Sequence, residues 1–345
     1  MNQHRHRPAG IRADAPVRAA VPIRLDALTN PYGPSPLVGD AVLALDGAPD
    51  RGAALPERLR RRVAEMAGVP VEWVMLGNGA DELLANFALA TRDAGAMILF
   101  PPAETPEIAP ARRFGFEAIA LRRAAGFAPE LDLEMAAELP PGAVALVGSP
   151  SDPTGAMLSV QDAVRLARAC SLVIVDERHG GYGPRSLASL AREFDNVVVI
   201  QSFELWAGLD AYPVAWAITP PKLRQLLVPD LRPLAVGSAA AGLATLDDLR
   251  AIQATTRAVR QERSRLYRML RKLNLTQPLP SWANFLLVKA TRSDARQIAD
   301  GLAARSILVH QPQAEGLHNY LRVSAGLPRQ TDALRDALIE VALEI

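Results

Sequence analysis

Two short stretches of the chain carry residues whose types and spacing could do chemistry. Asp176 closes the apolar run SLVIVDE and His179 follows three residues later, and a carboxylate beside a histidine suits general acid-base work or a hard divalent cation. The motif GNGADE places Gly77, Gly79 and Ala80 in a tight loop before a helix, where free N–H groups and the helix dipole form an anion site. Each pattern also has a plain structural interpretation, as a strand-end carboxylate and as a turn.

The overall composition excludes several classes of partner. The 345 residues carry 38 basic and 37 acidic side chains, a formal net charge of +1, which gives no electrostatic case for nucleic acid or an anionic membrane surface. No apolar run approaches the roughly 20 residues that a membrane span needs. The single cysteine, Cys170, cannot form an intramolecular disulfide. We therefore predict a cytoplasmic protein without nucleic-acid or membrane partners.

The elements that would position these residues follow an α/β pattern. Short apolar runs alternate with helical segments, which is typical of a mixed, mostly parallel sheet covered on both faces. The proline-free stretch 236–273 predicts one long helix. We predict a disordered leader (1–20), an N-terminal arm (21–45), a large domain (46–235), and a connecting helix with a smaller α+β domain (236–345).

Seven motifs occur in a fixed order along the chain: NPYGPSP, GNGADE, SDPTG, VIVDE, SFELWAGLDAYPV, ANF and NYLRVSAG. Together they resemble the fold-type-I aminotransferases of class I/II, and histidinol-phosphate aminotransferase most of all. The resemblance covers nearly the whole chain after the leader. It implies a homodimer with active sites between large and small domains, and pyridoxal phosphate bound to a lysine as a Schiff base.

The same resemblance places Leu205 at the position of the Schiff-base lysine. Leucine can neither form an imine nor carry a proton between substrate and cofactor, so ordinary transamination should stop. The arginine that grips the cofactor phosphate corresponds to Pro213, whose side chain has no donor. We therefore expect no pyridoxal phosphate bound as a lysine Schiff base.

Four further positions depart from the family pattern. Glu104 stands where an aromatic ring stacks on the cofactor, Asp152 where an asparagine contacts its phenolic oxygen, and His179 where a tyrosine is expected. Ala48 replaces a tyrosine that reaches the cofactor phosphate of the partner. These substitutions all weaken the same site.

Other family positions are retained. Asp176 matches the aspartate that holds the pyridinium nitrogen, and Arg322 matches the arginine that clamps a substrate carboxylate. Tyr32 and Asn284 also fit substrate-binding positions, and Gly79 with Ala80 keeps the anion-binding loop. A small carboxylate or phosphate ligand is therefore expected. If Asp176 is buried without a pyridinium, desolvation should either favour its protonated form or demand another cation, and His179 is the nearest candidate for that cation.

Three hypotheses for function follow. The first is a degenerate homologue that does not transaminate but binds an amino-acid-like or phosphorylated metabolite, with Leu205 and Trp206 filling the vacated cofactor pocket. The second is an active enzyme that uses a displaced lysine or a non-covalent cofactor with His179 as base, although the only lysines are Lys222, Lys272 and Lys289.

The third hypothesis belongs to a different class. A metal-dependent or cofactor-independent enzyme could use Glu104, Asp152, Asp176 and His179, since carboxylates with a histidine suit a divalent cation or acid-base catalysis. Their spacing matches no recognised metal motif.

Overall fold

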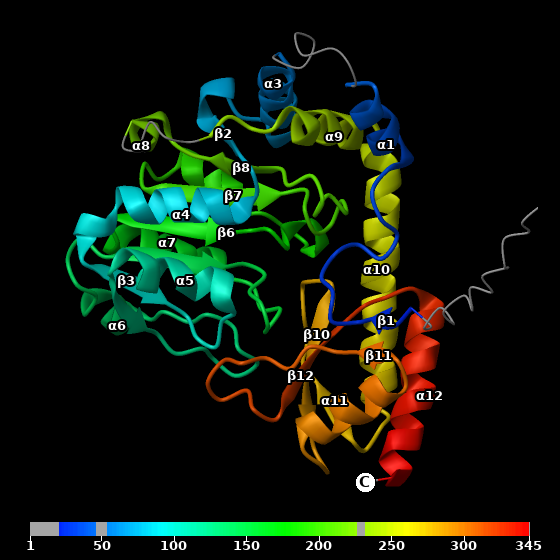
Figure 1. Cartoon of the computed structure of the whole chain (residues 1–345). Helices are drawn as coiled ribbons and strands as arrows, with labels where there is room; N and C mark the ends of the chain where they lie inside the picture. Colours follow the sequence, from blue (N-terminus) through cyan, green and yellow to red (C-terminus); the bar gives the residue numbers. More distant parts are fainter. Residues whose placement is uncertain (1–20, 46–53, 226–231, 345) are drawn as a thin grey trace, which may run out of the picture.

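The computed structural model describes residues 21–45, 54–225 and 232–344. The predicted leader and Ala48 lie outside the described residues. The large part of the structure is built on a seven-stranded sheet. Figure 1 shows this layered part, a long helix running down one side of it, and a smaller part at the end of that helix. This arrangement agrees with the predicted α/β class; the domain boundaries stay a prediction.

The seven strands lie in the order β2-β8-β7-β6-β5-β3-β4. Neighbours from β4 to β7 pair in parallel, and β8 pairs antiparallel with β7 and β2. Every residue of β3, β5 and β6 is buried, which explains why these strands read as unbroken apolar runs. Their bounds are β2 Val74–Gly77, β3 Ala96–Leu99, β4 Glu117–Ala120, β5 Val144–Gly148, β6 Leu172–Asp176, β7 Val197–Ser202 and β8 Ala215–Ile218.

Helices cover both faces of this sheet (Figure 1). Apolar side chains of α4 and α5 pack on one face, and those of α6 and α7 pack on the other. The helices of this part are α1 Pro36–Leu43, α3 Leu55–Ala67, α4 Ala80–Ala90, α5 Thr105–Phe114, α6 Leu133–Ala137, α7 Val160–Ala169 and α8 Pro221–Arg224, with short 3-10 turns at Val71–Trp73, Arg92–Ala94, Gly180–Tyr182 and Ala188–Arg192.

The stretch predicted as one long helix is two helices, α9 (Val236–Asp247) and α10 (Leu249–Leu270). The prediction was wrong because Asp248, at φ −114° and ψ 29°, leaves helical geometry. Its carboxylate accepts a hydrogen bond of 2.6 Å from the Ser35 hydroxyl, at the start of α1. The almost fully buried α9 packs against α1 and α3, so tertiary contacts set the break.

The smaller part holds a three-stranded antiparallel sheet, β12-β10-β9, covered by α11 and α12. The N-terminal arm joins it, because β1 pairs in parallel with β11. The bounds are β1 Ile23–Arg24, β9 Thr276–Pro278, β10 Phe285–Ala290, β11 Ile307–Leu308, β12 Tyr320–Ser324, α11 Ala295–Ala304 and α12 Pro328–Glu344. Across the described ranges, no helix has the length and apolar character needed to cross a membrane.

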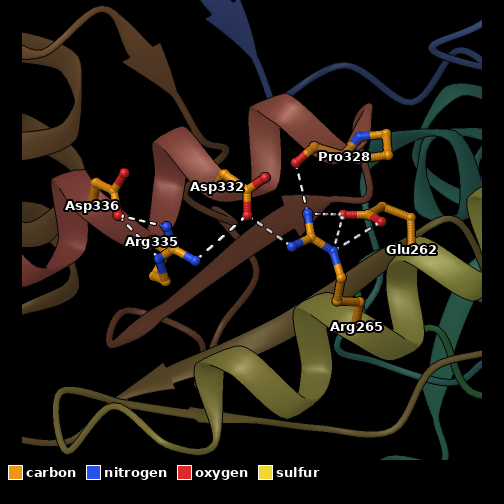
Figure 2. A network of polar contacts seen from close by, with 6 residues as sticks. All are labelled: Glu262, Arg265, Pro328, Asp332, Arg335 and Asp336. Atoms are coloured by element: carbon orange, nitrogen blue, oxygen red, sulfur yellow. Dashed lines mark hydrogen bonds and ion pairs between the residues drawn. The ribbon is translucent and has the colours of Figure 1, made fainter.

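One polar network connects α10 to α12 (Figure 2). Arg265 donates to both carboxylate oxygens of Glu262 at 3.0 and 3.1 Å, to Asp332 at 2.8 Å and to the carbonyl of Pro328 at 2.6 Å. Only 8% of the Glu262 side chain is exposed. The arginine therefore neutralises a nearly buried carboxylate while it holds two helices together.

Candidate functional site

A cavity of about 100 Å³ opens at the carboxyl ends of β5, β6 and β7, the edge at which open α/β sheets bind ligands. It brings together several predicted residues that lie far apart in sequence. Its lining consists of Leu28, Glu104, Glu107, Pro150, Asp152, Asp176, Arg178, His179, Glu204 and Leu205. Tyr32 does not line the cavity, and 43% of this residue is exposed.

Asp176 is buried at the end of β6 and forms an ion pair with Arg178. The Arg178 Nε donates to its carboxylate at 2.7 Å, and the Arg178 backbone N–H donates at 3.0 Å. Burial opposes the charge of Arg178, but Asp176 and Asp81 raise its pKa above the ordinary value. The prediction that His179 supplies the cation for Asp176 was wrong, because Arg178 forms the ion pair with this carboxylate instead.

His179 is a neutral, buried side chain at physiological pH. Burial lowers its pKa to about 4, and its ring meets Phe285 edge to face with centroids 5.4 Å apart. Its Nδ1 has no hydrogen-bond partner in the part of the chain that the structure describes. A base with so low a pKa abstracts protons weakly at neutral pH.

The anion site predicted at Gly79 and Ala80 is already filled. The Ala80 N–H, at the start of α4, donates to the Glu204 carboxylate at 2.9 Å. Gly79 permits this approach, since a Cβ there would lie 3.0 Å from Glu204 Oε1. Pro213 lies on the same side, where that Cβ would be 3.4 Å from its Cβ. The helix N-terminus therefore binds a carboxylate of the chain itself.

Arg322, on β12, is occupied in the same way. Its Nη1 donates to both oxygens of Asp152 at 2.8 and 2.5 Å, and Nη2 donates to the carbonyl of Asp26 at 3.0 Å. The paired side chains are only 7% and 14% exposed. Arg322 and the glycine loop each hold an internal carboxylate, so an external anion would have to displace it, and the predicted ligand stays a prediction.

The orphaned polar atoms of the site lie beside this pair. Asn284, the middle residue of the ANF motif directly before β10, donates through Nδ2 to the Leu28 carbonyl at 2.5 Å. Its Oδ1 and the Arg322 Nε are buried and have no hydrogen-bond partner among the residues described. His179 Nδ1 is likewise without a partner among the described residues. Because buried polar atoms normally have hydrogen-bond partners, these three atoms could still bind polar groups of a ligand.

Two glutamates of the site were not singled out from sequence. Glu107 is buried in α5, where its carboxylate accepts from Ser151 Oγ at 3.1 Å and from the Asp152 N–H at 3.0 Å. Burial raises its pKa to about 7. Its spacing of three residues from Glu104 could have indicated a shared helix face. Glu204 could have been found as the charged residue beside Leu205 in an otherwise apolar loop.

The described ranges offer no ready ligand set for the metal hypothesis. No group of three or more His, Cys, Asp or Glu side chains is arranged there to hold a metal ion. Glu104 pairs with His310 at 3.0 Å, and the hydrogen bond from His310 lowers the pKa of Glu104. Asp152 and Asp176 are bound to arginines.

The N-terminal arm fixes the loop that contains Leu205. The Asn30 N–H donates to the Leu205 carbonyl at 2.8 Å, and Asn30 Nδ2 donates to the Trp206 carbonyl at 2.9 Å. Leu205 lines the cavity as expected, whereas Trp206 instead packs beside Phe203 with ring centroids 5.3 Å apart. The leucine therefore takes the pocket-filling role without the tryptophan.

Comparison with known proteins identifies the family. The family model for aminotransferase class I and II matches residues 52–339. The chain belongs to the aminotransferase class I and II family. Histidinol-phosphate aminotransferase of Roseiflexus castenholzii is 34% identical over 334 residues, which cover 93% of this chain and 90% of the relative.

Other histidinol-phosphate aminotransferases are also similar to this chain, at lower sequence identity. Histidinol-phosphate aminotransferase 1, chloroplastic, of Arabidopsis thaliana is 29% identical over 92% of this chain and 77% of its own length. The crystal structure of histidinol-phosphate aminotransferase from Sinorhizobium meliloti in complex with pyridoxal 5'-phosphate aligns with a TM-score of 0.81 at 23% identity, covering 94% of this chain and 91% of that one. The structural likeness confirms the fold.

Proposed function

We propose that this chain is a histidinol-phosphate aminotransferase homologue that does not carry out ordinary pyridoxal-phosphate transamination. The observation that carries the proposal is the Glu204 carboxylate on the Ala80 N–H, next to Leu205 in the cavity. A cofactor phosphate would need the same N–H group, which the Glu204 carboxyl group already occupies. Leu205, at the family's lysine position, offers no amine for an imine.

The remaining residues also fit pyridoxal phosphate poorly. The cavity of about 100 Å³ is smaller than the roughly 300–1,000 Å³ of typical ligand sites. All three lysines are exposed, Lys222 on α8, Lys272 after α10 and Lys289 on β10, and none lines the cavity. The competing hypothesis of an active enzyme with a displaced lysine therefore has no amine in place.

The residual function proposed for the site is the binding of an amino-acid-like or phosphorylated metabolite. The unpartnered Arg322 Nε and Asn284 Oδ1 support it, since buried polar atoms normally have partners. A ligand carboxylate would have to displace Asp152 from Arg322. Asp152 would therefore compete with the ligand for this guanidinium. Binding of this kind suits a regulatory or partner subunit rather than a catalyst.

Borohydride trapping tests the loss of imine chemistry. The purified protein is incubated with pyridoxal phosphate and reduced, and any adduct is mapped by mass spectrometry. We expect no adduct on Lys222, Lys272 or Lys289 beyond the level found with heat-unfolded protein. A stoichiometric adduct at one lysine in the folded protein, together with aminotransferase activity on histidinol phosphate, would overturn the proposal.

The variant Asp152→Asn tests the internal competition. Removing the carboxylate leaves Arg322 without its partner, so we expect L-phenylalanine to bind at least about tenfold more tightly than to the wild type. Isothermal titration calorimetry measures the change, and Asp152→Asn with Arg322→Gln serves as the control that should remove the gain. Equal affinity in wild type and Asp152→Asn would show that Asp152 does not guard the arginine.

A further inference from the structure

A second cavity, of about 340 Å³, lies away from the first and shares no lining residue with it. It opens between the second half of α10, the segment 280–282 and the start of β10. Arginine and aromatic side chains dominate its wall, with Arg263, Tyr267 and Arg268 from the helix and Trp282 from the segment. The volume falls in the range of small-molecule sites, roughly 300–1,000 Å³.

Arg263 is a cation without a counter-ion. Its Nη1 donates to the carbonyl of Ala283, and no carboxylate of the described residues pairs with it. Burial, followed by repulsion from Arg260, lowers its pKa to about 10. Two residues further along, Arg265 pairs with Glu262 and Asp332 (Figure 2). A partly desolvated guanidinium is costly unless an anion offsets its charge.

Aromatic surface lies beside this charge. Trp282 is 47% exposed, although large aromatic residues are normally mostly buried in proteins. Its backbone is fixed, since its N–H donates to the carbonyl of Gly155 at 2.8 Å. Tyr267 lines the same cavity half-buried, and Arg271 lies over its ring at 5.9 Å from the centroid. Exposed tryptophan with arginine is the composition of binding hot spots.

We propose that this cavity binds a small molecule that carries an aromatic ring and one anionic group, a carboxylate or a phosphate. The anion pairs with the free edge of Arg263, and Arg268 adds positive charge at the mouth. The ring lies against Trp282 and Tyr267. The inference goes beyond the proposed function, and its outcome is independent of whether pyridoxal phosphate binds in the first cavity.

Calorimetric titration of the full-length protein with phenyl phosphate tests the proposal. Inorganic phosphate carries the charge without the ring, and phenol carries the ring without the charge. We expect phenyl phosphate to saturate one site with a dissociation constant below about 1 mM, and each fragment to bind at least about tenfold more weakly. No saturable heat, or equal affinity for inorganic phosphate, overturns the proposal.

Variants locate the binding. Arg263→Gln should weaken phenyl phosphate at least about tenfold, and Trp282→Ala should weaken it several-fold through the lost ring contact. Arg257→Gln, an exposed arginine on the same helix outside the cavity, is the matched control and should leave affinity unchanged. Since Trp282 is exposed, its alanine variant stays folded. Unchanged affinity in Trp282→Ala and Arg263→Gln overturns the assignment to this cavity.

Discussion

Three carboxylates of the candidate site each pair with one basic side chain, whereas Glu107 has no such partner among the described residues. Asp176 pairs with Arg178, Asp152 with Arg322 and Glu104 with His310, while Glu107 has only hydroxyl and amide donors on its oxygens. A carboxyl group buried without a direct cation favours the protonated form. The charge of Glu107 therefore depends on pH near neutrality.

The variant Glu107→Gln tests this pH dependence. Burial raises the folded-state pKa of Glu107 from 4.5 to about 7, so the folded chain holds a proton that the unfolded chain releases in this window, and stability falls as pH rises through it. The neutral glutamine removes this loss. We therefore compare the free energy of unfolding of Glu107→Gln with that of the wild type. We expect this difference to shift in favour of the variant by about 1–3 kcal/mol as the pH rises from 4.5 to about 7.

Chemical unfolding at a series of pH values measures the gain. His179 has an opposite effect, since its lowered pKa of about 4 makes stability fall as pH drops below the unfolded value, but it is present in both proteins and cancels in the difference. Glu193→Gln, at an exposed glutamate, is the control. Parallel pH profiles for wild type and Glu107→Gln would contradict the prediction.

The residue types of the site can be predicted from the sequence, but their pairing cannot. The motifs placed Asp152, Asp176, His179 and Leu205 in one cavity, because strand ends meet at one edge of a parallel sheet. The motifs do not indicate that Arg178 rather than His179 contacts Asp176. The choice depends on side-chain direction after the strand and on burial, which a motif does not encode.

At the scale of elements, α10 and α12 are held together by the Arg265 network in addition to apolar packing. Arg265→Ala would leave Glu262, with 8% of its side chain exposed, without its cation. Removing one partner of a nearly buried pair is destabilising. We expect a loss of about 1–2 kcal/mol in the free energy of unfolding, measured with urea.

A matched variant on α11 separates this effect from loss of surface charge. Arg296 pairs with Asp300 at 3.9 Å, and both side chains are at least 75% exposed. Arg296→Ala should change stability by less than about 0.5 kcal/mol. Equal losses of unfolding free energy in Arg265→Ala and Arg296→Ala would mean that the connection between α10 and α12 does not stabilise the fold.

Strands were easier to predict than helix boundaries. The apolar runs of β3 and of β5 to β8 coincide with strands that are almost entirely buried, because both sheet faces are covered there and a covered strand needs an apolar sequence. The edge strand β4 is mostly exposed. The break between α9 and α10 is not local. It depends on Ser35, which is distant in sequence and contacts Asp248 only in the folded chain.

At the scale of the whole molecule, we expect a homodimer, as the family resemblance implies. Leu37 and Leu43 of α1 are 45% and 74% exposed. Leu37 also lines a groove between α1, α3 and α9 whose wall is mostly leucine and alanine, with Arg58 and Asp247. Light scattering should give twice the chain mass of 37.0 kDa. Leu43→Asp should shift the equilibrium toward monomer, because a carboxylate opposes burial in an interface.

Leu133→Asp provides the control for this experiment. Leu133 on α6 is also 74% exposed but lies on another helix, away from the groove. The Leu133→Asp variant should therefore have the same mass by light scattering as the wild type. A wild-type mass equal to one chain at all concentrations would contradict the homodimer.

The pairing of β1 with β11 sets an order of events during synthesis. Ile23 and Arg24 leave the ribosome long before their partners Ile307 and Leu308 are joined to the chain. Chains fold progressively from the N-terminus as they emerge, yet this strand has to wait for nearly the whole polypeptide. The two partners of this pairing are therefore made at widely separated times, and β12, which pairs with β10, still follows β11 off the ribosome.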